Sequence, residues 1–502
     1  MTSPRSAESA STVSGTPPGL RLGIGIMVDG VVVGVGEGVG VAVYELPRWI
    51  VPGHIAVAVR ACLGWRPTAT GLERTGEPVN EPEIFTLPNG LRVVMTVIPT
   101  AQSAATSFFV RVGSRDENPR TNGLSHYIEH MLFKGTEKMP TAAQISETIE
   151  GAGGGLNAFT TKEITCYWNN LPYERIETGI SVLADSVQHS LLASEEIERE
   201  RTVVQQEIRR AHDSPGAFVG ELLSTAAYGE QPVGWPIAGS IETVQGMQRV
   251  DFVDHIAGFY NASNSVLSVA GNIDPAQVRD LVEREFGTLG GGHTANFDAA
   301  TSARPDEHIL IEQREIEQTN LALSAPGVGR HDADRYALDI MNTALGRGMS
   351  SRLFTEVRER RGLAYSVSSG SSRYMDIGTV NVSAGVTREH QEEALQVITA
   401  ELQRLVDEPM GDEELARTKE YATGSFRLAL ETPMALGQRR GTQLLMDNAI
   451  EPPDVTVERL RTVSATDIQR VARRVFGERK YSLAVVGPSA SADRLDAILA
   501  GG

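Results

Sequence analysis

The second half of the chain repeats the plan of the first. Residues 195–199, Glu-Glu-Ile-Glu-Arg, resemble residues 413–417, Glu-Glu-Leu-Ala-Arg, at an offset of 218. The apolar segment 265–271 resembles segment 481–487, at an offset of 216, and a short loop and a helical pattern follow each. Self-similarity at a long, nearly constant spacing indicates duplicated units. Runs of strands beside pairs of helices favour α+β sandwiches over a doubly wound sheet, so we expect two related α+β domains.

Residues 1–83 do not share this plan. They contain no lysine, and a Gly/Val run from Leu20 to Val43 is interrupted by Asp29 and Glu37. These acids argue against a secretory signal, and the glycines weaken any strand, although a small β element is an alternative. We interpret residues 1–83 as a poorly ordered extension or as one that is not part of the natural protein. We expect the first domain at 84–287, a non-periodic linker at 288–305 and the second domain at 306–502.

Charge and cysteine content limit which partners and which cellular compartment are expected. The chain has 46 Lys+Arg and 64 Asp+Glu, a net charge of −18, and so acidic a protein is a poor binder of nucleic acid or of anionic membranes. No apolar stretch reaches the ~18 residues of a membrane-spanning helix. Cys62 and Cys166 are two isolated thiols, which suit a reducing compartment. We therefore expect a cytoplasmic protein with neither a nucleic-acid nor a membrane partner.

The sequence His126-Tyr127-Ile128-Glu129-His130 has the spacing of a metal site on a helix. Positions four apart face the same way, so the two histidines can share one zinc ion. Glu129 lies on the same flank and can reach a metal-bound water without binding the metal. Two surface histidines with an ion-paired glutamate remain the alternative interpretation of these five residues alone.

A catalytic zinc ion needs a third protein ligand and an open position for water. Glu200 and Glu207 are seven positions apart, two turns on one face of a predicted helix over 194–213. One of them can bind the metal while the other orients a ligand histidine. The helix pattern alone does not choose between them, and a solvated acidic face would look the same.

Three segments together resemble a known protein family. They are residues 123–136 around the two histidines, residues 153–160 with the sequence Gly-Gly-Gly-Leu-Asn-Ala-Phe-Thr, and the pair Glu200 and Glu207. The combination is similar to the pitrilysin/insulinase family of zinc metallopeptidases, the inverzincins. Within that family it looks closest to half-length bacterial members similar to the mitochondrial processing peptidase beta subunit. The resemblance runs from about Phe85 to the C-terminus.

This resemblance implies one Zn²⁺ per chain and assigns its ligands. The family's third ligand stands at a fixed offset from the second histidine, and Glu207 stands at that offset from His130 whereas Glu200 does not. The resemblance thus implies that His126, His130 and Glu207 bind the metal. Glu129 is then the general base, and Glu200 lies near the metal without binding it.

The resemblance also implies a fold and a substrate grip. Two homologous α+β domains, each a mainly antiparallel sheet covered by helices, would form half of a clamshell chamber. The second domain has no His-x-x-x-His pair, so it is expected to be inactive. Arg358 and Tyr365, seven positions apart, resemble the family's second signature, which holds the substrate and assists catalysis. Substrate-binding positions are implied at Asn157, Ala158 and Phe159.

The expected function is a zinc-dependent metalloendopeptidase that hydrolyses unfolded peptides inside a closed chamber. Because both signatures lie on one chain, the expected partner is a second copy, which makes a homodimer. The alternative is a non-catalytic subunit, or one subunit of a heteromeric enzyme similar to a processing peptidase.

Overall fold

The computed structural model describes residues 81–292, 294–295 and 297–501, together with the backbone of three short segments nearer the N-terminus. These segments, β1 (Gly25–Val28), β2 (Val31–Val35) and β3 (Val41–Glu45), form an antiparallel sheet. Strands β1 and β2 lie within the Gly/Val run and β3 begins in it, at the place of the small β element given above as the alternative interpretation. The rest of residues 1–80 lies outside the described residues, so the nature of this extension stays a prediction. By its internal contacts the chain divides into the units Met1–Gly76 and Glu77–Gly502.

The first half of the larger unit is built on a six-stranded sheet with the strand order β4-β5-β9-β6-β8-β7. Only β5 and β9 are parallel, and every other neighbouring pair is antiparallel. The mainly antiparallel sheet expected from the sequence is therefore confirmed. The strands are β4 (Glu83–Thr86), β5 (Arg92–Val97), β6 (Ser103–Val110), β7 (Gly155–Thr160), β8 (Thr165–Pro172) and β9 (Ser265–Gly271).

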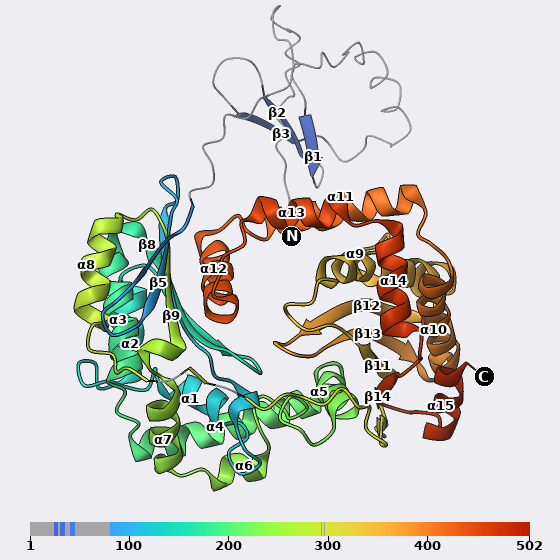
Figure 1. Cartoon of the computed structure of the whole chain (residues 1–502), viewed down its shortest axis with the longest axis horizontal. Helices are drawn as coiled ribbons and strands as arrows, with labels where there is room; N and C mark the ends of the chain where they lie inside the picture. Colours follow the sequence, from blue (N-terminus) through green and yellow to red (C-terminus); the bar gives the residue numbers. More distant parts are fainter. Residues whose placement is uncertain are drawn as a thin grey trace, which may run out of the picture. The chain divides into compact units, whose positions relative to one another are not determined.

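Helices α3 and α8 cover one face of this sheet (Figure 1). The core there joins Phe108 on β6 to Leu183 on α3 and Phe286 on α8, all fully buried. Apolar side chains recur at helical spacing on α3 and α8, which explains why both present one continuous apolar face to the strands. The helices of the first half are α1 (Leu124–Met131), α2 (Ala142–Gly151), α3 (Ile176–Gln188), α4 (Ser194–Asp213), α5 (Pro215–Tyr228), α6 (Ile241–Gly246), α7 (Arg249–Phe259) and α8 (Pro275–Phe286).

The second half repeats the architecture. Its sheet has the order β10-β14-β11-β13-β12, with β10 and β14 parallel, which matches β5-β9-β6-β8-β7 strand for strand. The two related α+β domains expected from the repeat are therefore present. The strands are β10 (Ile309–Glu312), β11 (Gln318–Pro326), β12 (Ala364–Arg373), β13 (Gly378–Thr387) and β14 (Ser482–Val486). The helices are α9 (Arg335–Gly346), α10 (Gln391–Asp407), α11 (Asp412–Leu428), α12 (Pro433–Asp447), α13 (Pro453–Thr462), α14 (Ala465–Phe476) and α15 (Ala492–Ala500).

Each half also contributes one helix to the other half's sheet. Helix α5 packs on β11 and β14 through Val219 and Leu223, whereas α12 packs on β5, β6 and β9 through Leu444 and Leu445 (Figure 1). The apolar area buried by this exchange joins the halves into one unit. It lies on the face of each sheet opposite the main helical layer.

The segment that connects the halves, residues 288–305, contains no helix or strand among its described residues, and its role as a linker stays a prediction. Hydrogen bonds nevertheless tie it to both halves. The Arg115 guanidinium donates to the Asp298 carbonyl at 3.1 Å, and the Ala300 amide donates to Asp376 at 2.8 Å. Within the described part of the chain, no helix combines the length and the apolar character that a membrane crossing requires.

Candidate metal centre

The local sequence sets the orientation of α1. Leu124, Tyr127, Ile128 and Met131 are buried at a spacing of three and four positions, which turns the intervening polar positions away from the core. Gly123, with a φ of 101°, begins the helix in a backbone conformation that favours glycine. The half-buried positions of this face are His126, Glu129 and His130.

The N-terminus of α1 is capped from a distance by Glu117. Its buried carboxylate accepts hydrogen bonds from the backbone amides of Gly123 and Ser125, each at 2.7 Å, and from the Asn122 side chain at 3.0 Å. These bonds satisfy amides that an α-helix leaves free at its start. Burial raises the pKa of Glu117 to about 7 despite these bonds.

Helix α4 places Glu207 beside the two histidines of α1. Ligand atoms of His126, His130 and Glu207 all lie within 4.8 Å of one another. Glu207 Oε2 is 3.3 Å from His130 Nε2 and 3.8 Å from His126 Nε2. Bonds of ~2.0–2.1 Å to a tetrahedral zinc ion place ligand atoms about 3.4 Å apart. The donor chemistry and the spacing therefore fit Zn²⁺ with two histidines and one carboxylate.

Glu200 lies on the other side of His130. Its Oε2 is 3.0 Å from His130 Nδ1, and its Oε1 is 2.5 Å from the Lys134 ammonium. The side chain of Glu200 is only 6% exposed, whereas that of Glu207 is 45% exposed. The geometry thus groups Glu207 with the histidines and leaves Glu200 where it can fix the orientation of the His130 ring.

Glu129, the one carboxylate of the motif at residues 126–130, faces the edge strand β7. Thr160 Oγ1, at the end of β7, donates a hydrogen bond of 2.6 Å to Glu129 Oε2. Burial raises the pKa of Glu129, although the Thr160 bond and the nearby His130 oppose this shift. The other carboxylate oxygen of Glu129 makes no hydrogen bond with any described residue.

The two histidines differ in their electrostatic surroundings. Burial and the neighbouring His130 lower the pKa of His126 to about 4. Burial also acts to lower the pKa of His130, but its bond to Glu200 and the charges of Glu207, Glu200 and Glu129 raise it overall. His126 Nδ1 is buried and has no hydrogen-bond partner within the described structure.

The predicted substrate-binding residues of the first half lie on β7, which ends its sheet. No described strand pairs with the outer edge of β7, so its free backbone groups can accept an added strand. Asn157 is exposed, and Ala158 packs on the core beneath α1. Phe159 points to the opposite face of the sheet, where it packs beside the apolar residues of α12.

Arg358 and Tyr365 come together, but apart from His126, His130 and Glu207, which form the candidate metal-binding group. Arg358 lies in a π-helical segment, Phe354–Arg360, and Tyr365 lies on β12, the edge strand of the second sheet. The Arg358 guanidinium carbon is 5.6 Å from the centre of the Tyr365 ring, and Tyr365 is 80% exposed. Within the described residues, no hydrogen bond, ion pair or ring contact links either residue to the metal-binding group.

Sequence reasoning missed three residues that support the site. Glu117 and Thr160 contact α1 or its carboxylate, and Lys134 contacts Glu200 of α4, yet none of the three belongs to a ligand pattern. Thr160 stands at the end of the segment 153–160, but its role depends on β7 lying beside α1. In the sequence, Glu117 is only an acidic residue a few positions before a helix. That is a weak signal for a buried cap, since most acidic residues are exposed to solvent.

Comparisons with known proteins place these observations in context. The model of Insulinase (Peptidase family M16) matches residues 92–240, and that of the Peptidase M16 inactive domain matches residues 247–421. An uncharacterized zinc protease of Streptomyces coelicolor is 37% identical over 409 residues, covering 80% of this chain and 89% of that protein. An uncharacterized zinc protease of Bacillus subtilis is 35% identical over 407 residues, covering 81% and 98% respectively. The solved structure of a protease from Helicobacter pylori has a TM-score of 0.75 at 22% identity, covering 82% of this chain and 100% of that one, and shows the likeness of fold.

Proposed function

The chain belongs to the insulinase family, peptidase family M16, and we propose that it is a zinc-dependent metalloendopeptidase of unfolded peptides. The family expected from the three sequence segments is confirmed. The observation that carries the proposed activity is the grouping of His126, His130 and Glu207 within 4.8 Å. The names of the two zinc proteases described above support the choice of metal. A non-catalytic role is less well supported, because the full ligand set and Glu129 are present.

In the proposed mechanism, His126, His130 and Glu207 would hold a zinc ion, whose Lewis acidity would lower the pKa of a water molecule toward ~7. Glu129 accepts the proton of the attacking water and later donates it to the leaving amine. Thr160 holds the Glu129 carboxylate through one oxygen and leaves the other for this proton transfer. Glu200 fixes the orientation of the His130 ring through its contact with His130 Nδ1.

The substrate in this proposal is an extended peptide that pairs with the free edge of β7. Backbone pairing gives affinity without a demand for one particular sequence, which suits unfolded chains. Asn157 and Ala158 would border the cleavage point on that strand. Where the second domain faces a zinc site, Arg358 would hold the substrate carbonyl and Tyr365 would donate a hydrogen bond to the oxyanion. Amide hydrolysis needs such donors because negative charge develops on the carbonyl oxygen.

Metal content and peptide cleavage test the proposal together. Purified protein should carry one zinc ion per chain and should cleave a library of unstructured peptides, with the products identified by mass spectrometry. Chelation should abolish cleavage, and stoichiometric Zn²⁺ should restore it. Zinc-loaded protein that cleaves no peptide in such a library would contradict the proposed function.

A further inference from the structure

A cavity of about 730 Å³ is lined mainly by residues of the second half of the chain and shares none with the candidate metal-binding group. Helices α9, α11, α12 and α13 surround it, and the end of β12 closes one side. One residue of the first half, Phe159 on the edge strand β7, also contributes to its wall. Nothing in the proposed mechanism uses this space.

The cavity is the second half's counterpart of the metal site. Helices α9 and α11 pack together beside β12 as α1 and α4 pack together beside β7. At the repeat offset of 218, Glu207 corresponds to Ser425, which lines the cavity. Asp339 and Thr343 of α9, the helix that packs on α11 as α1 packs on α4, also line it. The described lining contains no histidine, so it cannot bind zinc as the first half's set can.

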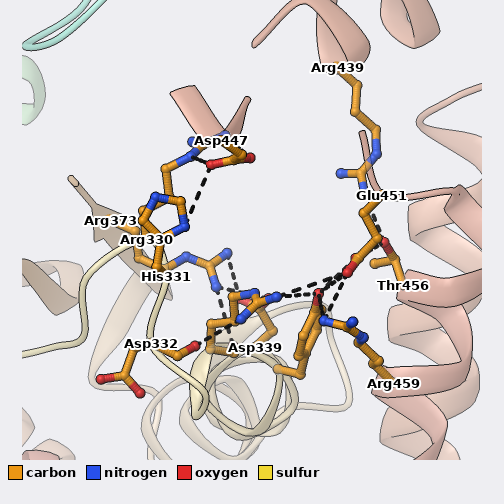
Figure 2. A network of polar contacts seen from close by, with 12 residues as sticks. Arg330, His331, Asp332, Asp339, Arg373, Arg439, Asp447, Glu451, Thr456 and Arg459 are labelled. Carbon is orange, nitrogen blue, oxygen red and sulfur yellow. Dashed lines mark hydrogen bonds and ion pairs between the residues drawn. The ribbon is translucent and has the colours of Figure 1, made fainter. Parts of the chain in front are cut away.

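Arginines dominate the lining instead. Five arginines and three carboxylates line the cavity. Two of the arginines are neutralised in close pairs, which Figure 2 shows. Arg330 binds Asp447 through two nitrogens, at 2.5 and 2.9 Å. Arg373 binds both oxygens of Asp339 at 3.1 Å. The five lining arginines are Arg330, Arg335, Arg347, Arg373 and Arg439.

The third carboxylate is shared rather than paired with one arginine. Glu451 accepts hydrogen bonds from the Tyr336 hydroxyl at 2.7 and 2.8 Å and from Thr456 at 2.6 Å. It is also 2.9 Å from Arg459 and 3.9 Å from Arg335. Figure 2 shows these contacts converging on Glu451.

Two arginines of the lining have no carboxylate in direct contact. Arg439, on α12, donates only to the Thr456 hydroxyl, at 2.8 Å, and its Nε is buried without a partner in the described structure. Burial lowers the pKa of Arg439, although the more distant charge of Glu451 opposes this shift. Arg347, which follows α9, is exposed and makes neither an ion pair nor a side-chain hydrogen bond with any described residue. The cavity therefore has an excess of positive charge that an anionic ligand can satisfy.

We propose that this cavity binds a carboxylate of the peptide substrate, with Arg439 as its main partner and Arg347 as its second. The inference rests on the proposed peptidase function and narrows its substrates to peptides with an acidic side chain or a free C-terminus near the cleavage point. Guanidinium groups recognise carboxylates through paired hydrogen bonds. An excess of about two positive charges suits a single carboxylate better than a polyphosphate.

Phe159 connects the cavity to the path of the substrate. It lies on β7, where the peptide is proposed to add a strand, and its side chain reaches the cavity wall. Successive residues of an added strand point to opposite faces of the sheet. A residue of the peptide that faces away from α1 therefore points toward the same side as Phe159.

The test compares matched peptides on protein that binds but does not cleave. Fluorescent peptides of one sequence would carry Glu or Gln at each position in turn, and a free or amidated C-terminus. Their affinities for zinc-loaded Glu129→Gln protein would be measured by fluorescence anisotropy. We expect at least one carboxylate peptide to bind roughly tenfold more tightly than its amide counterpart, in keeping with one charge-assisted interaction. The Glu/Gln and acid/amide arms distinguish a side-chain carboxylate from the C-terminus.

Variants then assign the preference to the cavity. Adding Arg439→Gln should bring the carboxylate-to-amide ratio close to one, whereas Arg439→Lys should retain part of it. Arg347→Gln, at an exposed position, should reduce the ratio even if the Arg439 variants fold poorly. Arg494→Gln on α15 removes an arginine that pairs with Glu392 outside the cavity, and should keep the ratio.

The outcomes separate this inference from the proposed function. Equal affinities for every carboxylate and amide pair would overturn the cavity proposal, and so would a preference that survives both Arg439→Gln and Arg347→Gln. Cleavage by the parent protein without any such preference would leave the peptidase function standing alone. Carboxylate-dependent binding without cleavage by the parent would support the cavity and contradict the peptidase.

Discussion

Glu129 is positioned by one hydroxyl, since Thr160 binds one of its carboxylate oxygens at 2.6 Å. An amide in its place can keep a similar shape but cannot accept a proton. We therefore expect Glu129→Gln to retain zinc and to lose about 10²–10⁴-fold in kcat, the usual size of a general-base effect. Metal analysis and initial rates on one peptide would check this. Glu147→Gln, an exposed position on α2, is the matched control. A rate close to that of the parent would remove Glu129 from its proposed role.

The two glutamates of α4 should respond differently to the same change. Glu207 lies 3.3 Å from His130 Nε2, whereas Glu200 contacts the opposite ring nitrogen and Lys134. We expect Glu207→Gln to lose zinc on dialysis, because a neutral amide is a poor zinc ligand. Glu200→Gln should retain zinc with an affinity weaker by about 10–100-fold. The metal content of both variants after dialysis against a graded chelator would test this, and the reverse order would exchange their roles.

The histidine motif and the segment 194–213 could be predicted from the sequence because both are local patterns. The spacing of His126 and His130 requires only a helix, and α4 spans Ser194–Asp213 as its pattern indicated. Thr160 and Glu117 could not be predicted, because their contacts with α1 depend on how distant segments pack. The cavity around Arg439 could not be predicted from the sequence either, because its wall combines several elements of the second half with one strand of the first.

Helix α12 contacts the first sheet through two glycines, which permit a close approach of the backbone. The backbone carbonyl of Gly437 accepts a hydrogen bond from Ser268 at 2.8 Å, and a Cβ on Gly441 would stand 2.3 Å from the Phe109 ring. Phe109 is fully buried and cannot easily move aside. The internal repeat does not reveal that α12 and α5 pack on the opposite halves' sheets, because both helices have apolar faces that would suit either sheet.

We expect Gly441→Ala to destabilise the protein by about 1–3 kcal/mol, as overpacking in a dense core does. Gly220→Ala is the matched control on α5, because nothing lies within 4 Å of a Cβ at that position. There the gain in helix propensity should stabilise by about 0.5–1 kcal/mol. Thermal unfolding of both variants beside the parent would measure the difference. Equal unfolding temperatures would show that α12 can shift to make room.

The two halves of the unit Glu77–Gly502 depend on each other. Arg115, with a side chain only 1% exposed, binds Glu163 of its own half at 2.8 Å and Asp376 of the other at 2.6 Å. Together with the exchanged helices, this pair of contacts indicates that neither half would be stable alone. The Arg115 and Glu163 charges are buried, so removal of one partner would leave the others uncompensated.

Removal of residues 1–78 should leave folding and activity intact. No candidate ligand lies in that segment, and the first strand of the larger unit begins at Glu83. The truncated protein should match the full chain in soluble yield, zinc content and rate on one unstructured peptide. An insoluble or inactive truncated protein would show that residues 1–78 contribute to folding or to activity.

The arrangement of the two signatures leads to the last prediction. The metal-binding group and the Arg358–Tyr365 pair lie on one chain, yet no hydrogen bond, ion pair or ring contact joins them in the described residues. Because both signatures lie on one chain, we propose that a second copy, rather than a different partner, completes an enclosure in which an Arg358–Tyr365 pair faces a zinc site. We therefore expect a homodimer in solution, which sedimentation at assay concentration would measure. Because an enclosed site admits only unfolded chains, the dimer should cut peptides of tens of residues and leave native albumin intact. A fully active monomer would contradict the pairing, and efficient cleavage of a tightly folded domain would contradict the enclosure.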